Sequence, residues 1–362
     1  MANLRFLRGY NDAVVLGLAR RGEPMTRVEL AERSGLTPQA VSKIVTRLIA
    51  DGLLVDSGRR NVGVGKPRTL VRLVASSRLA LGAAVERDEL RVVLADLSGA
   101  VIDRTVVSLP RDFGPEVFVD ELSRLVDILR SRNEVSDERL LGVGIGFVGP
   151  LDHRDGVVHD ATGLVGWHDV PLRDLAAERL RLPVVVDKDT NTAMIAESWR
   201  RGDELRHAAL VLVGTGVGVG LLLDGQVHRG ARTNAGEYGH TTIQLGGPRC
   251  ACGRSGCVEI VHNLALAADD LKGAVTVLGM AVAGLVQLLD LDHVVLGGRV
   301  VQSAPDVYAD GIRDVVRDQV PRSDWLQVDV SVSPLGDDLV AAGAAMLVLS
   351  EFYSQRAPSQ TS

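Results

Sequence analysis

The stretch HAALVLVGTGVGVGLLLDGQVHRG (residues 207–230) predicts three short strands, joined first by a glycine-rich turn and then by a second turn. Further on, GLVQLLDLDHVVLGGRVV (residues 284–301) predicts a helix, a strand and a glycine turn. A similar order of strands and helices runs through residues 90–109, 115–132, 140–152 and 182–201. Two such passes predict an α/β body of two lobes with a cleft between them.

The chain of 362 residues is too long for one ordinary core, and its charge is uneven. Residues 1–75 contain 13 Lys/Arg and 6 Asp/Glu, which gives a head of net charge +7, and the remaining residues have a net charge of −13. A basic head has the sign that attracts nucleic acid. We therefore expect a DNA-binding head (1–75), a first lobe (79–190) and a second lobe (191–350) that includes a lobe-closing helix.

The segment TRVELAERSGLTPQAVSKIVTRLIADGLL (residues 26–54) predicts two short helices and a turn. Thr26 and Glu29 form a capping box at the first helix, and Thr37 with Pro38 begins the second. Apolar residues at helical spacing predict a buried stripe on the second helix: Val41, Ile44, Val45 and Leu48. Its polar face is typical of a recognition helix that meets base edges: Thr37, Gln39, Ser42, Lys43, Thr46 and Arg47.

A helix around residues 11–21 would complete a three-helix unit, and LLVDSGRRNVGVGKPRTLVRL (residues 53–73) predicts a β-hairpin wing. Basic residues at the wing tip are suited to phosphates or a minor groove: Arg59, Arg60, Lys66 and Arg68. The alternative is a helical interaction domain whose basic face is only solvated. The pattern, charge and wing together favour operator DNA, bound by a dimer because two half-sites need two recognition helices.

The N-terminal residues MANLRFLRGYNDAVV contain scattered arginines and lack the apolar core of a signal peptide. The longest uncharged apolar run, residues 273–289, is at the short limit for crossing a bilayer, so we expect a buried helix. We therefore expect a cytoplasmic protein without a membrane partner.

All three cysteines of the chain, Cys250, Cys252 and Cys257, lie in RCACGRSGC (residues 249–257). Gly253 and Gly256 allow the loop to curl around a metal. Three thiolates need one more ligand for tetrahedral zinc, and His240 is the nearest upstream candidate. The spacing predicts one structural Zn²⁺ per chain; the alternative is three unrelated buried cysteines.

Two further features suit a ligand site. The turn VGTGVGVG (residues 213–220) follows a strand and can hold phosphate through backbone N–H groups, although such glycines also serve tight hairpins. Asp187 and Asp189 leave a buried strand and enter a helix at the junction of the lobes. The alternative is that Asp189 or Thr190 caps that helix.

These features together resemble the ROK family of repressors, uncharacterised reading frames and sugar kinases. The family's glycine-turn motif is similar to residues 212–240, with Glu-x-Gly-His at 237–240, and its motif Cys-x-Cys-Gly-x-x-Gly-Cys-x-Glu runs from Cys250 to Glu259. GFVGPLD (146–152) and VVLGG (294–298) also match. The resemblance covers residues 1–75, as the winged-helix head of the repressor branch, and about 79–350 as the body.

The resemblance implies an actin/hexokinase-like (RNase H-like) body that binds a sugar between its lobes. By motif, the sugar hydroxyls would meet Asp189, Glu237, His240 and Glu259. Carboxylates accept paired hydrogen bonds from neighbouring hydroxyls, which agrees with this assignment. In the family His240 would serve both zinc and sugar through its two ring nitrogens.

Two departures from the kinase members stand out. Their phosphate-holding Asp-x-Gly-Gly-Thr is replaced, in an alignment without gaps, by Ala84, Glu86, Arg87 and Asp88, and we expect Glu86 and Asp88 to repel a triphosphate. Lys188 occupies the position of an Asn that normally contacts sugar. It leaves the sugar's identity open and is compatible with an anionic ligand; the alternative is that it pairs with Asp187 or Asp189.

The leading hypothesis is a sugar-responsive transcriptional repressor without enzyme activity, whose homodimers, or dimers of dimers, bind operator DNA and a sugar effector. The alternative is an ATP-dependent sugar kinase with Asp189 as general base. In a third hypothesis the body has lost ligand binding and only dimerises.

Overall fold

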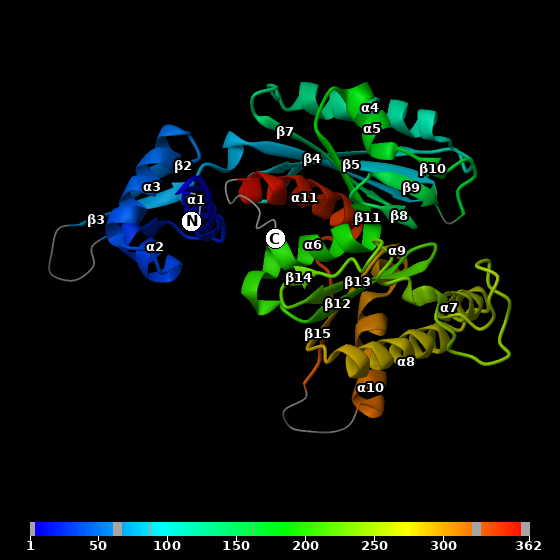
Figure 1. Cartoon of the computed structure of the whole chain (residues 1–362). Helices are drawn as coiled ribbons and strands as arrows, with labels where there is room; N and C mark the ends of the chain where they lie inside the picture. The colour runs from blue at the N-terminus through cyan, green and yellow to red at the C-terminus, as the bar shows by residue number, and fades with distance from the viewer. Residues whose placement is uncertain (1–3, 61–66, 87, 162, 321–326, 356–362) are drawn as a thin grey trace.

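The computed structural model describes residues 4–60, 67–86, 88–161, 163–320 and 327–355 (Figure 1). Of the residues singled out above, Lys66 and Arg87 lie outside these ranges. Helices and strands of the head gather on one side of a larger α/β body. This arrangement confirms the fold class expected from the sequence.

The helices in the described part of the head are α1 (Leu4–Arg20), α2 (Arg27–Ser34) and α3 (Pro38–Ala50). Its sheet has the order β1 (Met25–Thr26), β3 (Arg68–Leu73), β2 (Leu54–Arg60), so β2 and β3 form the predicted wing. Thr26 and Glu29 form the capping box, Thr37 caps α3 with Pro38 in its first turn, and the stripe on α3 is buried. The local caps therefore set the helix starts as the sequence predicts.

The first lobe is built on a five-stranded sheet of order β11-β7-β4-β5-β6. Its strands are β4 (Leu79–Glu86), β5 (Glu89–Asp96), β6 (Val101–Ser108), β7 (Leu140–Phe147) and β11 (Val184–Lys188). The helices α4 (Pro115–Arg132) and α5 (Leu172–Leu180) cover its outer face. A small antiparallel sheet, β8 (Leu151–Asp152), β9 (Val157–Asp160) and β10 (His168–Val170), lies beside it.

The second sheet has the order β14-β13-β12-β15-β16, in which two antiparallel pairings are followed by two parallel ones. The first sheet has the same pattern when it is followed from β6 to β11. Its strands are β12 (Ala208–Val213), β13 (Val217–Leu223), β14 (Gln226–Val227), β15 (His293–Gly297) and β16 (Asp329–Val332). The helices of this lobe are α7 (Val258–Ala267), α8 (Leu271–Leu289), α9 (Arg299–Ser303) and α10 (Pro305–Gln319). The strands predicted at 207–230 are β12, β13 and β14.

Two helices, α6 (Asp189–Arg201) and α11 (Leu339–Gln355), pack against each other between the two sheets (Figure 1). The sequence division assigned α11 to the second lobe, but α11 packs on β4 and β7 of the first. Glycines permit this approach: a Cβ at Gly144 would lie 1.9 Å from the carbonyl oxygen of Ala344. The small residues of these elements therefore let a helix pack closely on the first sheet.

We expect Gly144→Ala to destabilise the protein by about 1–3 kcal/mol, because the added methyl group forces α11 away from β7. Denaturant unfolding of the full chain measures the change. Gly17→Ala on α1 is the matched control, since a Cβ there meets no atom within 4 Å and alanine favours a helix. Equal stability of both variants and the parent would contradict the close packing of α11.

Among the described helices, α8 is long and apolar enough to cross a membrane, and half of its most apolar window is buried in the protein. Nine of its residues are buried, among them Val275, Leu278 and Val282. Val275, Leu278 and Val282 belong to the second-lobe core together with residues of α10 and β15. The burial agrees with the core helix expected from the sequence.

Head and body share a continuous core. Val15 and Leu16 of α1 belong to the same buried cluster as Leu349 and Tyr353 of α11. The Arg20 guanidinium lies 4.0 Å from the ring centroid of Trp199, at the end of α6, and donates a hydrogen bond to the Trp199 carbonyl oxygen (3.1 Å). The segment between head and body contains a short 3₁₀ turn, residues 75–77, that hydrogen-bonds to the body.

Candidate functional site

A pocket between the lobes brings together all five residues expected to contact sugar. Asp189 begins α6, Glu237 and His240 lie at a short 3₁₀ turn, and Glu259 lies in the first turn of α7. Lys188 ends β11 and lines the same pocket. The glycine turn between β12 and β13 forms one wall. The structure thus places three carboxylates, an imidazole and an ammonium around one hollow.

Glu259 is tied to the glycine turn. Its Oε2 accepts a hydrogen bond from the Val217 backbone N–H (2.9 Å). A Cβ at Gly216 would lie 2.6 Å from the same oxygen, so only glycine fits there without displacing the carboxylate. The turn therefore holds a carboxylate at the pocket wall, a use of its amides that sequence reasoning did not predict.

Burial raises the pKa of Asp189 to about 6, an effect that nearby Lys188 opposes and that Glu237 and Glu86 reinforce. Its side chain accepts a hydrogen bond from the Thr190 N–H (2.7 Å). Lys188, not Asp189 or Thr190, occupies the N-cap position of α6, and its side chain forms no capping hydrogen bond. Asp189 is thus a carboxyl group that changes charge near neutral pH.

Lys188 pairs with neither of the neighbours considered in the sequence. Its Nζ, with the side chain only 2% exposed, donates to Glu237 Oε1 (3.0 Å) and to the Ala235 carbonyl oxygen (2.5 Å). Asp187 instead accepts hydrogen bonds from Arg229 Nε (2.7 Å) and Asn191 Nδ2 (2.8 Å). The ammonium is therefore neutralised within the protein, which removes the argument that it favours an anionic ligand.

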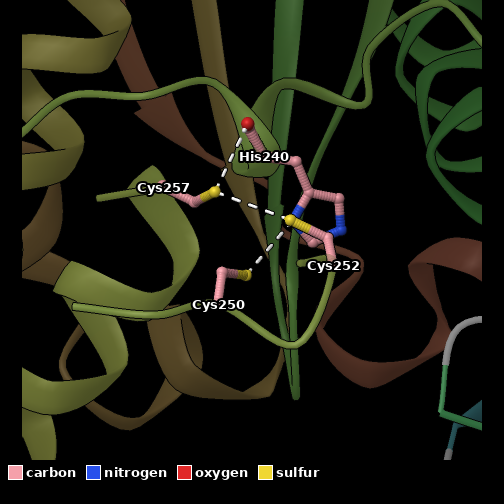
Figure 2. Close-up of side chains that lie close together, drawn as sticks. All are labelled: His240, Cys250, Cys252 and Cys257. Atoms are coloured by element: carbon pink, nitrogen blue, oxygen red, sulfur yellow. Dashed lines mark hydrogen bonds between the residues drawn. The ribbon is translucent and has the colours of Figure 1, made fainter. Parts of the chain in front are cut away.

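The three cysteines and His240 converge on one point (Figure 2). Their candidate ligand atoms all lie within 4.8 Å of one another. His240 Nδ1 lies 3.7 Å from Cys250 Sγ, and Cys252 Sγ lies 3.7 Å from Cys257 Sγ. Gly253 and Gly256 have positive φ, +87° and +67°, as the expected curl of the loop requires. The cluster has the number and type of ligands that tetrahedral zinc prefers.

The donor set itself favours a cation. Burial, followed by the neighbouring thiols, raises the pKa of Cys257 to about 12. The pKa of Cys252 is lowered, mainly by a hydrogen bond from the Arg254 backbone. Three thiols this close cannot all ionise without a positive charge among them, whereas a divalent ion supplies that charge. These residues fit a metal, with His240 Nδ1 as the nitrogen ligand.

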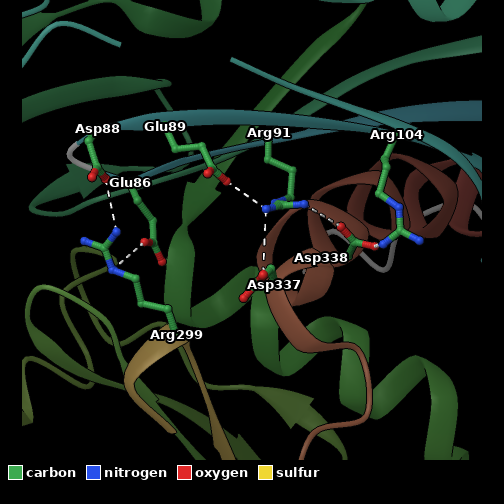
Figure 3. A network of polar contacts seen from close by, with 8 residues as sticks. All are labelled: Glu86, Asp88, Glu89, Arg91, Arg104, Arg299, Asp337 and Asp338. Carbon is green, nitrogen blue, oxygen red and sulfur yellow. Dashed lines mark hydrogen bonds and ion pairs between the residues drawn. The ribbon is translucent and has the colours of Figure 1, made fainter. Parts of the chain in front are cut away.

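The turn that, by the family resemblance, stands in place of the kinases' phosphate-holding sequence lies between β4 and β5, and its acids Glu86 and Asp88 are drawn in Figure 3. Glu86 and Asp88 do not stand as free charges, because both contact Arg299 from the opposite lobe, at 3.3 Å and 3.1 Å. Ala84 and Glu86 line a second pocket that adjoins the first through Asp189. The acids were predicted from the sequence but Arg299 was not, although VVLGGRVV (residues 294–301) includes the glycine turn beside it.

The polar face of α3 is exposed at five of the six predicted positions: Thr37, Gln39, Ser42, Lys43 and Thr46. Arg47 is different, because its guanidinium forms a bidentate ion pair with Asp12 of α1. In the wing, Arg59 and Arg68 are exposed, while Arg60 binds Glu29 and the Pro24 carbonyl oxygen. Arg47 and Arg60 therefore have structural partners inside the head.

The model of the ROK family matches residues 81–272, more than half of the chain. The chain belongs to the ROK family. Residues 13–60, which include α2 and α3, match the MarR family model. The ROK body is therefore joined to a head that is similar to the MarR family.

Relatives of this ROK protein include both repressors and kinases. A putative xylose repressor from Caldicellulosiruptor sp. (strain Rt8B.4) is 24% identical, over 98% of this chain and 99% of its own length. A glucokinase from Halalkalibacterium halodurans is 32% identical, over 52% of this chain and 57% of its own length. A solved ROK family transcriptional regulator, described as a homolog of the Escherichia coli MLC protein, has a TM-score of 0.79, 21% identity and 97% and 98% coverage. The two proteins that are similar over nearly the whole chain, head included, are thus one named as a repressor and, by fold, one described as a transcriptional regulator.

Proposed function

We propose that this ROK protein is a sugar-responsive transcriptional repressor. The pocket of Asp189, Glu237, His240 and Glu259 binds a sugar, and the exposed face of α3 binds operator DNA. The observation that carries the proposal is the presence of this pocket on the same chain as a winged helix-turn-helix head. A repressor acts on DNA, so we place the protein in the cytoplasm.

The metal is proposed to be one structural Zn²⁺. All four donors come from the chain, which leaves no position for a reacting water. Bound there, zinc would fix His240 and the loop that leads to Glu259. The imidazole and the carboxylate would then meet the sugar in a set position.

Two subunits are proposed to bind one operator, since a recognition helix on each reads one half-site. Sugar binding must favour one arrangement of the heads over another, and a coupling of about 1–3 kcal/mol would change DNA affinity roughly 5- to 150-fold. The packing of α1 against α11 and α6 provides the physical connection, since α6 begins in the pocket and ends beside Arg20.

A sugar kinase remains the second candidate, because Asp189 and the glycine turn are retained and the glucokinase similarity covers the body. Against it, the acids at the position that the family resemblance gives to the kinases' phosphate turn, Glu86 and Asp88, are paired with Arg299. A coupled assay with ATP, Mg²⁺ and a panel of hexoses separates the two. We expect no turnover above the background of Asp189→Asn; robust turnover would replace the repressor proposal.

The repressor proposal is tested by selecting DNA fragments with the full-length protein and then titrating xylose, glucose and N-acetylglucosamine into the complex. We expect specific, salt-sensitive binding and at least a fivefold change in DNA affinity with one of these sugars. If no sugar alters DNA binding and calorimetry detects no sugar binding, the repressor proposal fails. The protein would then be a DNA-binding protein whose body only dimerises.

Lys43→Ala and Arg47→Ala are expected to differ. Lys43 is exposed, so its loss should weaken DNA binding without lowering the melting temperature. The slope of log affinity against log salt concentration should become shallower by about 1. Loss of Arg47 leaves the nearly buried Asp12 carboxylate unpaired, which should cost about 1–3 kcal/mol of stability. Fluorescence anisotropy with labelled DNA and thermal melting measure the two effects. A stable Arg47→Ala variant would refute the structural role of that pair.

A further inference from the structure

The cationic side chains of the interlobe cleft are all engaged within the part of the chain that the structure describes. Besides His240 of the metal cluster, the two adjoining pockets are lined by three cations: Lys188, Arg91 and Arg299. Lys188 is paired with Glu237. Arg91 contacts Glu89 Oε1 (2.8 Å) and Asp338 Oδ1 (3.1 Å). An incoming anion therefore meets no unpaired cation among these residues.

Arg299 forms a bridge between the lobes (Figure 3). It begins α9 of the second lobe, and its Nε and Nη1 contact Glu86 Oε2 (3.3 Å) and Asp88 Oδ1 (3.1 Å) beside the first-lobe turn. We call these two contacts the Arg299 bridge. The bridge uses both acids that the sequence places at the lost phosphate turn, so the arginine that lines the pocket is neutralised by them.

Carboxylates outnumber these cations in the cleft. The described linings contain six: Glu86, Glu89, Asp189, Glu237, Glu259 and Asp337. The glycine turn offers little compensation, because the Gly214 N–H donates to the Gly216 carbonyl oxygen and the Val217 N–H to Glu259. A phosphate would thus enter an excess of negative charge, with two of the turn's amides already used. Uncharged hydroxyls carry no such penalty and can donate to the carboxylates.

We propose that the Arg299 bridge determines ligand specificity: it restricts the cleft to uncharged sugars and excludes phosphorylated sugars and nucleotides. This inference rests on the proposed sugar-binding function and narrows its ligand class. Releasing Arg299 should convert a neutralised side chain into a free phosphate-binding cation. Glu86→Gln with Asp88→Asn does so while nearly conserving the size of both acids.

The test is calorimetry on the full-length, metal-loaded protein, with glucose and N-acetylglucosamine, their 6-phosphates and ATP as probes. For the parent we expect binding of an uncharged sugar and at least a hundredfold weaker binding of its 6-phosphate. In E86Q/D88N the ratio of the two dissociation constants should shift about tenfold toward the 6-phosphate, and the gain should fade at high salt. Adding Arg299→Ala to that variant should remove the gain.

The matched control is D310N/D314N, which removes the same two charges from exposed ion pairs on α10, outside both pockets. It should keep the parent's ratio. If the parent binds the 6-phosphate as tightly as the uncharged sugar, the inference is wrong, but the proposed repressor function is unaffected. The same conclusion follows if the gain in 6-phosphate affinity persists without Arg299. If no sugar of either class binds or alters DNA affinity, the proposed function itself fails.

Discussion

Replacing Cys252 with alanine is expected to leave the protein with less than one zinc ion per chain and to abolish the effect of sugar on DNA binding. Cys252 is exposed, so the substitution removes a thiolate ligand with little loss of packing. With two thiolates and His240 left, the loop loses the fixed course that holds the imidazole and Glu259 at the pocket. Substituting a residue that only hydrogen-bonds to a metal ligand typically lowers metal affinity about 10- to 100-fold. Loss of a ligand itself should lower it further.

Metal content by mass spectrometry and DNA affinity with and without sugar measure this effect. Ser255→Ala, an exposed position in the same loop, is the control and should retain both zinc and the sugar response. Head stability should change little, since Cys257 is the N-cap residue of α7, which lies on the side of the body away from the head (Figure 1). A Cys252→Ala protein with one zinc per chain and full response would disprove the role of the cluster.

Asp189→Asn is expected to weaken sugar binding about 10- to 100-fold, because hydrogen bonds from sugar hydroxyls to a carboxylate are stronger than those to an amide. The pocket should keep its shape, as asparagine is nearly isosteric. Calorimetry with the sugar found to bind the parent gives the change. Asp174→Asn on α5, an exposed residue paired with Arg173, is the control. Unchanged affinity in Asp189→Asn would place the sugar elsewhere.

The same residue predicts a pH dependence. The folded-state pKa of Asp189 is about 6, raised by burial above its ordinary value of 3.8. If the carboxylate binds the sugar, affinity should fall as the pH is lowered from 7 to 5, and the fall should be absent in Asp189→Asn. For stability the sign is opposite: the folded form binds the proton more tightly, so this group's contribution is full below pH 3.8 and is lost as the pH rises through about 6.

Local sequence patterns predicted much of the site. The cysteines lie within eight residues of one another, and helix caps depend on residues three apart, so neither required knowledge of the tertiary fold. The repeated strand order predicted both lobes because each strand carries its own apolar run. The five residues proposed to contact sugar were identified from motifs, and the structure brings them to one pocket.

Contacts between distant segments were not predicted in the same way. Lys188 was considered with its neighbours, but strand geometry directs Asp187 away toward Arg229 and leaves Glu237 as the partner of the ammonium. Arg47 was assigned to DNA because its helical position is suitable, yet Asp12 of another helix binds it. Arg299 and Glu86 are in contact, but most of the body's sequence lies between them. Charge patterns along the chain therefore gave no indication of their pairing.

The shared core of head and body limits how this ROK protein can be rearranged. Because Val15 and Leu16 are buried with Leu349 and Tyr353, and Arg20 stacks on Trp199, the head is not a module attached by a tether. A chimera that grafts this head onto another body would expose apolar surface unless the ends of α6 and α11 were transplanted with it. Heads of this type should therefore be exchanged between relatives only together with the surface on which they sit.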